Sequence, residues 1–301
     1  MPASSSVLQT TGLTRQFRRT IALDQLNLAI PEGAIYALVG VNGAGKTTLI
    51  KILMNILRPT RGRAEVFGRD SRCLSPADFR DIGYVSENQE LPGAMTVASF
   101  LAYLKPFYPG WDDACAAALL RDFDLPPGRK LRHLSKGMGL KAALVSSLAY
   151  HPRLLVLDEP FTGLDPLVRD ELIDGVLSQA KGTTVFISSH DLADVERFAT
   201  HLGHLHKGRL RLSEEMTALM QRFRDVEIAA VCEALPSALP KTWMAAEFAA
   251  GRVRFVESQF ENGRTLAEIR RVFGEQAKVA INPMPLREIF LTLAKAARME
   301  A

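Results

Sequence analysis

The stretch GVNGAGKTT, residues 40–48, decides the fold of this chain. It fits the spacing G-x-x-x-x-G-K-[ST] and stands between an apolar run at 34–39 and a segment at 47–57 with apolar residues at helical spacing. Glycines let the backbone curl so that successive N–H groups point at phosphate oxygens, and the helix start adds its positive dipole end. A strand, a glycine loop and a helix in this order predict a phosphate-binding loop.

The motif assigns roles to single residues of the loop. Lys46 would bring a positive charge to the β and γ phosphates, the Thr47 hydroxyl is placed to ligate Mg²⁺, and Thr48 can reach the α phosphate. The other residues expected to contact the nucleotide are Gly40, Asn42, Gly43, Ala44 and Gly45.

A second stretch, LVLDEPFTGLDP at 155–166, is a buried apolar run that ends in two adjacent carboxylates. Parallel sheets bind ligands beyond the carboxyl ends of their strands, so Asp158 can lie beside the phosphate loop. There it would hold Mg²⁺ through water, while Thr47 holds the ion directly. Glu159 can accept a proton from the water that attacks the γ phosphate, and is predicted to be the catalytic base.

The order of elements predicts two domains. Short continuous apolar strands alternate with helices up to about residue 210, which indicates an α/β domain with a parallel sheet covered on both faces. After about residue 223, strand candidates with partial alternation (VEIAAV, RVRFVES, KVAIN) mix with helical segments. The stretch CEALPSALPKTW, at 232–243, contains two prolines and is interpreted as a linking segment within this region. We expect a nucleotide-binding domain over residues 1–219 and a small α+β domain over 220–301.

Composition excludes several classes of protein. A net charge of +4 in 301 residues, with no run of five like charges, is not the localised charge of a nucleic-acid binder. No window approaches eighteen apolar residues and no signal peptide is visible, so any action on a membrane would require a partner.

Metal-binding and disulfide patterns are also weak. Cys73, Cys115 and Cys232 stand far apart, which is typical of a reducing cytoplasm. HLGHLHKG, at 201–208, has no carboxylate or cysteine to complete a metal site, and is interpreted as an edge hairpin.

Several motifs resemble, in order, those of the ATP-binding cassette (ABC) ATPases, over residues 7 to about 212. LSKGM (134–138) looks like the family's signature motif, and LLVLDEP like its second nucleotide motif. TGLD (162–165) is similar to the loop that follows, and SSH (188–190) looks like the switch histidine. The resemblance implies an ABC ATPase fold: a mostly parallel sheet with antiparallel β and helical subdomains.

This resemblance implies roles for further residues. Ser135 and the backbone of Gly137 would bind the γ phosphate of an ATP held by the opposite subunit, and Asp165 would couple the two sites. His190 would contact the γ phosphate and the attacking water. Phe17 falls at the position that stacks on adenine, although it can also be interpreted as a core aromatic. The implied ligands are ATP and Mg²⁺, in a head-to-tail pair with a second copy or a paired homologue.

The sequence departs from the family pattern in two motifs, at three positions. Glu87 stands where glutamine is usual; a glutamate can still reach Mg²⁺, but it adds negative charge beside phosphates. Lys136 and Met138 stand in the signature where glycine and glutamine are commonest. Lys136 either adds a favourable charge or points to solvent, and both interpretations remain open.

The helix around GMGLKAAL, the MTVASFL region and the segment PMPLREIFLTLAK resemble ATPases that energise type-2 ABC exporters. Those pair with a separate integral membrane permease, which implies a cytoplasmic protein peripheral to the membrane. Residues 87–111 would hold the groove for the permease's cytoplasmic helix. Its aromatic residues either line that groove or form a helical core; they are Phe100, Tyr103, Phe107, Tyr108 and Trp111.

The alternative is a soluble ABC ATPase acting on ribosomes or DNA. Ribosomal members resemble two cassettes in one chain and DNA-repair members carry a long coiled-coil insertion, whereas this sequence shows one cassette and no such insertion. A regulatory or dimerising role for 220–301 is also open. No nucleic-acid partner is expected, and the transported substrate is not readable from this chain.

Overall fold

The computed structural model describes residues 6–179, 182–229, 235–236 and 238–299. The chain divides into two compact units, Met1–Ser213 and Glu214–Ala301, which are described separately. The boundary expected from the sequence, after residue 219, falls inside helix α7 (Met216–Arg222). Cys232, the end of VEIAAV and much of the linking stretch lie outside the described residues.

A six-stranded sheet forms the centre of the N-terminal unit. In sheet order its strands are β10 (Arg209–Glu215), β9 (His201–His206), β3 (Ile35–Val39), β8 (Thr184–Ser189), β7 (Leu154–Asp158) and β6 (Ile82–Ser86). Every pair from β9 to β6 is parallel, which confirms the predicted parallel sheet. All residues of β7 and β8 are buried, as expected for strands covered on both faces.

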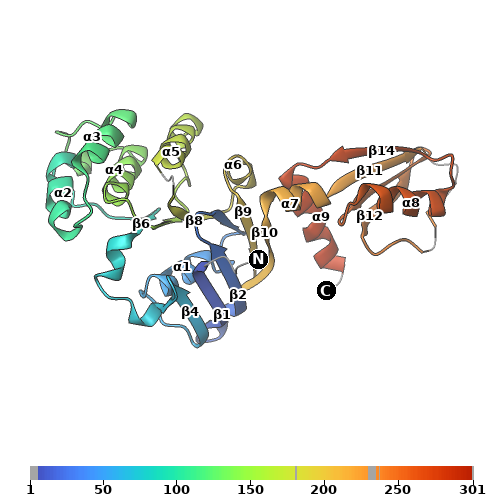
Figure 1. Ribbon diagram of the computed structural model, residues 1–301, viewed down its shortest axis with the longest axis horizontal. Coiled ribbons are helices and arrows are strands. Elements are labelled where there is room, and N and C mark those ends of the chain that lie inside the picture. Colours follow the sequence, from blue (N-terminus) through green and yellow to red (C-terminus); the bar gives the residue numbers. More distant parts are fainter. Residues whose placement is uncertain (1–5, 180–181, 230–234, 237, 300–301) are drawn as a thin grey trace. The chain divides into compact units, whose positions relative to one another are not determined.

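One face of this sheet is covered by helix α1 and an antiparallel sheet (Figure 1). The antiparallel sheet runs β2 (Thr20–Pro31), β1 (Ser6–Phe17), β4 (Arg61–Val66) and β5 (Arg69–Asp70). Helix α1 spans Lys46–Leu53 and is shorter than the helical pattern up to residue 57. Asn55 takes a left-handed conformation, and the Lys51 carbonyl accepts hydrogen bonds from the amides of Ile56 and Leu57, which ends the helix.

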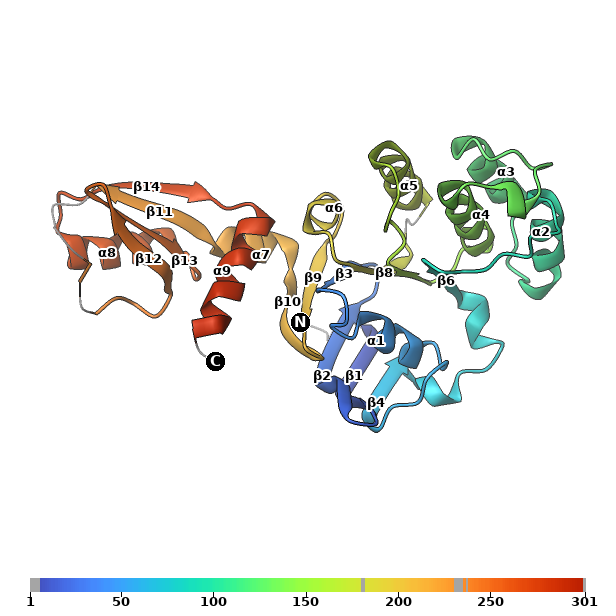
Figure 2. The same cartoon turned by 180° about the vertical axis from the view of Figure 1, so that it is seen from behind.

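Helices α4 and α5 lie on the other face of the parallel sheet, and α2 and α3 pack against α4 (Figures 1 and 2). Besides α1, the helices of this unit are α2 (Val97–Leu104), α3 (Asp113–Asp122), α4 (Lys136–Leu148), α5 (Pro166–Gln179) and α6 (Leu192–Glu196). Short 3₁₀ turns are η1 (Ser71–Cys73), η2 (Asp78–Asp81), η3 (Lys105–Phe107) and η4 (Leu131–His133). The burial of α4 on strand β6 fixes where the signature segment begins.

The C-terminal unit is an antiparallel sheet with helices, and its order is β12 (Trp243–Ala249), β13 (Arg252–Glu257), β11 (Arg224–Ala229) and β14 (Lys278–Pro283). Helices α8 (Asn262–Phe273) and α9 (Leu286–Met299) complete it. Strand β12 is an addition to the strands expected from sequence. Its segment WMAAEFA lacks β-branched residues, and it is held by pairing with β13 and by Trp243, which stacks on Phe255 at 4.1 Å.

The histidine-rich hairpin differs in one respect from the expectation. Strand β10 is an edge of the sheet, but β9 lies inside it, between β10 and β3. The rings of His204 and His206 lie 6.2 Å apart, and within the described ranges no three His, Cys, Asp or Glu side chains come together as a metal site would need. Over the same ranges, no helix is both long and apolar enough to cross a bilayer.

Candidate active site

The phosphate loop has the shape that its glycines require. A Cβ added to Gly40 would lie 2.4 Å from the Leu205 carbonyl oxygen, and one added to Gly45 would lie 2.4 Å from that of Ala22. Gly45 also has a φ of 112°, a conformation that other residues rarely adopt. Glycine is therefore required at both positions.

The rest of the loop forms a tight turn into helix α1. Ala44 is buried and its amide donates to the Val41 carbonyl at 3.0 Å, while Asn42 and Gly43 are exposed at the tip. Thr48, in the first turn of α1, is half-buried. Backbone amides at the start of a helix favour an anion, so the loop fits a phosphate group.

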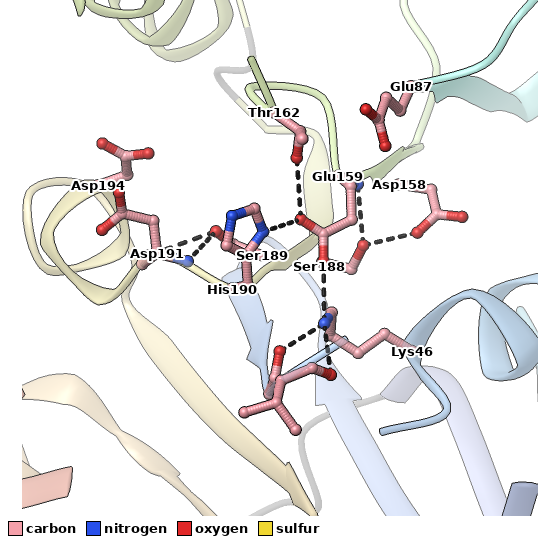
Figure 3. A network of polar contacts seen from close by, with 12 residues as sticks. Lys46, Glu87, Asp158, Glu159, Thr162, Ser188, Ser189, His190, Asp191 and Asp194 are labelled. Carbon is pink, nitrogen blue, oxygen red and sulfur yellow. Dashed lines mark hydrogen bonds and ion pairs between the residues drawn. The ribbon is translucent and has the colours of Figure 1, made fainter. Parts of the chain in front are cut away.

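Lys46 is held inside this loop by oxygen atoms (Figure 3). Its ammonium donates to the carbonyls of Gly40 at 2.5 Å and Val41 at 3.3 Å, and it pairs with Glu159 Oε1 at 2.9 Å. The side chain is only 5% exposed. A buried ammonium with flexible oxygen partners can exchange them for phosphate oxygens without losing its compensation.

Asp158 lies beside the loop, at the carboxyl end of β7. Its Oδ1 accepts hydrogen bonds from Thr47 Oγ1 at 3.1 Å and from Ser188 Oγ at 2.7 Å. A hydroxyl and a carboxylate oxygen are the hard ligands that Mg²⁺ prefers, so this pair fits the ion. The structure brings the two residues together as the strand order requires.

Glu159 is the centre of the polar cluster (Figure 3). Its Oε2 contacts His190 Nδ1 at 2.7 Å and accepts from Thr162 Oγ1 at 3.2 Å, and its amide donates to Ser188 Oγ at 2.9 Å. Its φ of 51° is left-handed, which is unfavourable for a non-glycine residue and is common at functional sites.

The pKa of Glu159 is lowered although the residue is partly buried. Burial would raise this pKa, but the hydrogen bonds from Lys46 and His190, together with their charges, outweigh burial and bring it below 4.5. The carboxylate is therefore ionised at neutral pH. His190 Nδ1 then carries the hydrogen of their contact, because an ionised carboxylate can only accept.

The signature and the TGLD loop make local contacts. Ser135 caps α4 by accepting from the Met138 amide at 3.3 Å. A Cβ on Gly137 would meet Val168 Cγ1 at 2.8 Å, so close packing of α5 requires glycine there. Asp165 Oδ1 accepts from the Leu167 amide at 2.9 Å. The contacts of these three residues are with the starts of α4 and α5, not with the phosphate loop.

The sequence left open whether Lys136 points to solvent and whether Phe17 belongs to the core, and the structure bears on both questions. Lys136 Nζ pairs with Glu87 Oε1 at 3.1 Å, so it does not simply point to solvent. The Glu87 amide donates to the Asp158 carbonyl at 3.0 Å, which places the backbone of Glu87 beside the cluster.

Phe17 is 40% exposed with the Arg15 guanidinium 4.3 Å above its ring, so it is not a core aromatic. Its stacking on adenine stays a prediction.

Three residues of this region were not singled out by sequence reasoning. Ser188 bridges Asp158 and Glu159, and Thr162 holds the carboxylate of Glu159. Arg169 binds Asp194 through two bonds of 2.8 and 2.9 Å and so joins α5 to α6, the helix that follows β8. Hydroxyls one strand away from an acidic pair are a usable signal for Ser188. Arg169 has no such signal, because its partner follows 25 residues later on another helix.

Comparison with known proteins agrees with this geometry. The family model described as "ABC transporter" matches residues 23–162. The chain is 31% identical over 303 residues to the daunorubicin/doxorubicin resistance ATP-binding protein DrrA of Streptomyces peucetius, covering 95% of this chain and 92% of that one. It is 32% identical to the bacitracin transport ATP-binding protein BcrA of Enterococcus faecalis, covering 72% of each. The lantibiotic transport ATP-binding protein SrtF of Streptococcus pyogenes is also 32% identical, over 69% of this chain and 91% of that one.

Solved structures agree as well. An ATP-binding subunit of an ABC transporter superposes with a TM-score of 0.65 at 29% identity, covering 72% of this chain and 92% of that one. A dimeric bacterial ABC transporter cassette gives a TM-score of 0.62 at 24% identity over 69% of this chain and 98% of its own, which supports the fold alone. These relatives do not favour a ribosome- or DNA-directed ATPase. The chain therefore belongs to the ABC transporter family, as an ATP-binding subunit with an ATPase domain.

Proposed function

We propose that this subunit hydrolyses Mg²⁺·ATP at the cluster around Glu159 and thereby drives export through a separate membrane permease. The observation that carries the proposal is the convergence of Lys46, Asp158, Glu159 and His190 beside the phosphate loop (Figure 3). Thr47 joins them through its hydrogen bond to Asp158. These residues come from three separate parts of the sequence. Bound Mg²⁺ would neutralise phosphate charge and orient the γ phosphate for attack by water.

Each residue of the cluster has a distinct proposed role. Lys46 would exchange Glu159 and its carbonyl partners for phosphate oxygens, and Thr47 and Asp158 would hold the metal. Release from Lys46 leaves Glu159 ionised and still oriented by Thr162 and His190. A fixed, ionised carboxylate is a suitable base for the attacking water.

A second copy, or a homologue, completes each site in this proposal. Ser135 and the Gly137 backbone lie at the start of a 13-residue helix whose amides favour an anion. Ser135 is exposed, and Gly137 packs on α5, so we propose that the Ser135 hydroxyl and the backbone amides of this helix start bind the ATP held by the partner. Asp165, in the neighbouring TGLD loop, would couple the two sites. Phe17 would stack on the adenine of the bound ATP. Closure of the pair over two ATP molecules would supply the conformational work.

A groove in the N-terminal unit is the proposed binding place for a permease segment. It has a volume of about 460 Å³. Its lining includes Ile56, Tyr84, Leu91, Phe100, Leu104, Tyr108 and Tyr150. Phe100 and Tyr108, expected from the sequence, do line it, while Tyr103 and Phe107 are exposed and pack on each other. A mixed apolar and polar groove of this size suits an amphipathic cytoplasmic helix. The subunit would then lie on the cytoplasmic face of the membrane.

The permease, not this chain, would choose the cargo. The relatives are named for bacitracin, lantibiotic and daunorubicin transport or resistance, three unlike compounds served by similar ATP-binding proteins. Because one of these relatives is named for resistance to the compound, we propose export as the direction of transport.

The test uses the variant Glu159→Gln, tagged and produced in the native cells. It should bind ATP, hydrolyse it at less than about one hundredth of the parent rate, and accumulate as a closed dimer. Purification from detergent-solubilised membranes with ATP and Mg²⁺, followed by mass spectrometry, should return a stoichiometric polytopic membrane protein. Ribosomal or DNA-bound proteins in its place would reject the transporter proposal.

Lys46→Ala is the matched control for nucleotide binding. It should lose measurable ATP affinity in a binding titration, because the buried ammonium is the cation that would face the β and γ phosphates. Unchanged affinity would remove the phosphate-loop assignment, and parent-rate hydrolysis by Glu159→Gln would remove the catalytic base.

A further inference from the structure

The ion pair between Glu87 and Lys136 joins the end of strand β6 to the start of helix α4. Glu87 directly follows β6, and Lys136 is the first residue of α4. An acid stands where glutamine is usual, a base stands where glycine is commonest, and the two side chains meet at 3.1 Å. Each of these two side chains therefore compensates the charge of the other.

A third segment lies at the same point. A Cβ built on Gly163 would be 3.4 Å from Lys136 Nζ, so the ammonium lies against the backbone of the TGLD loop. On the other side, the Glu87 amide is hydrogen-bonded to the Asp158 carbonyl at 3.0 Å. The pair thus connects the strand end beside a subunit's own metal ligand with two segments that would face the partner's ATP.

We propose that Lys136 is a positioning residue for Glu87, and that the Glu87–Lys136 pair couples a subunit's own ATP site to the signature segment it presents to its partner. The inference rests on the proposed function, because it needs ATP-dependent pairing of two subunits. A glutamate beside a triphosphate adds repulsion, and the lysine offsets that charge and directs the carboxylate. A glutamine at the same place needs no such cation.

The pair does not serve stability. The Lys136 side chain is 49% exposed and that of Glu87 is 28% exposed, and ion pairs this accessible to water contribute little to folding. Loss of Lys136 should therefore leave the melting temperature unchanged while changing the response to ATP. A structural role would show the opposite pattern.

The experiment measures ATP-driven dimer formation of the Glu159→Gln protein by sedimentation, at fixed Mg²⁺ and rising ATP. Adding Lys136→Gln should raise the ATP concentration for half-maximal dimerisation at least about fivefold, because Glu87 is then uncompensated. Adding Glu87→Gln as well should bring that concentration back to within about twofold of the starting protein. The coupling is the difference between the effects of Lys136→Gln in the two backgrounds.

Arg69→Gln is the matched control. Arg69 pairs with Asp78 at 2.9 Å, with side-chain exposures of 55% and 18%, but it lies on the antiparallel sheet. It should change neither the ATP dependence nor the melting temperature.

Two results would overturn the inference while leaving the proposed function intact. One is an equal effect of Lys136→Gln with Glu87 and with Gln at position 87, which would show that Lys136 acts independently. The other is a lowered melting temperature that accounts for the loss. A folded Glu159→Gln protein that forms no dimer with ATP would instead reject the proposed function, and the inference with it.

Discussion

The carboxylate of Glu159 receives contacts from three other side chains, and each contact has a separate consequence. Lys46 and His190 favour its ionised form, and Thr162 restricts the rotation of its carboxylate. Its left-handed φ turns the chain sharply after β7, so that Glu159 faces the loop while Asp158 remains in the strand. Two neighbouring acids thus reach different atoms, as the proposed division between metal ligand and base requires.

The lowered pKa of Glu159 predicts a pH-dependent stability difference between the parent and Glu159→Gln without nucleotide. The carboxylate compensates buried Lys46, so the variant should unfold more easily at pH 7, by about 1–2 kcal/mol. Because the folded-state pKa is below the unfolded value of about 4.5, this contribution is present above pH 4.5 and is lost as pH falls through the folded-state pKa.

Urea denaturation of both proteins from pH 8 to pH 3.5 measures this difference. The expected result is a constant gap above pH 5 that narrows below pH 4.5. A gap that widens towards acid would show that the pKa of Glu159 is raised instead.

At the scale of elements, two ion pairs of unequal burial tie helix α5 to α6 and to Arg197, the residue directly after α6. Arg169 binds Asp194 with side-chain exposures of 23% and 10%, whereas Arg197 and Asp170 are 53% and 46% exposed. Asp194 is close in sequence to His190, and Arg169 follows the TGLD loop. The buried pair therefore holds together the two segments that flank Glu159.

Arg169→Gln should destabilise the protein by about 2 kcal/mol, because it leaves the buried Asp194 carboxylate uncompensated. Arg197→Gln breaks the exposed ion pair between α5 and the end of α6 and should cost less than about 0.5 kcal/mol. Chemical denaturation of the two variants measures both values. Equal losses would mean that burial does not decide the strength of these pairs.

At the scale of the molecule, the groove and the active site lie on the same N-terminal unit and share strand β6. Ile82 and Tyr84 line the groove, and Glu87, directly after the strand, is hydrogen-bonded to Asp158. Tyr150 also joins the groove to this strand, because its hydroxyl donates to the Ile82 carbonyl at 2.9 Å. A shift of β6 on ATP binding would therefore be felt at the proposed permease contact.

Ile56→Asp tests that contact, because Ile56 is 60% exposed and lines the groove. Ile56→Asp should abolish co-purification of the permease. Its ATP affinity should stay within about twofold of the parent, and its free energy of unfolding within about 0.5 kcal/mol. Leu291→Asp, on helix α9 and 53% exposed, is the control and should retain the permease. The reverse pattern would move the contact to the C-terminal unit.

The sequence by itself determined the phosphate loop, the acidic strand and the parallel sheet. These depend on local physics: glycines at positive φ, apolar runs buried on both faces, and the succession of strand, loop and helix. Only the tertiary structure decided that Lys46 meets Glu159, that Lys136 meets Glu87, and that β12 is a strand. Such contacts join residues far apart in sequence, and they depend on sheet register and helix packing, which local patterns do not encode.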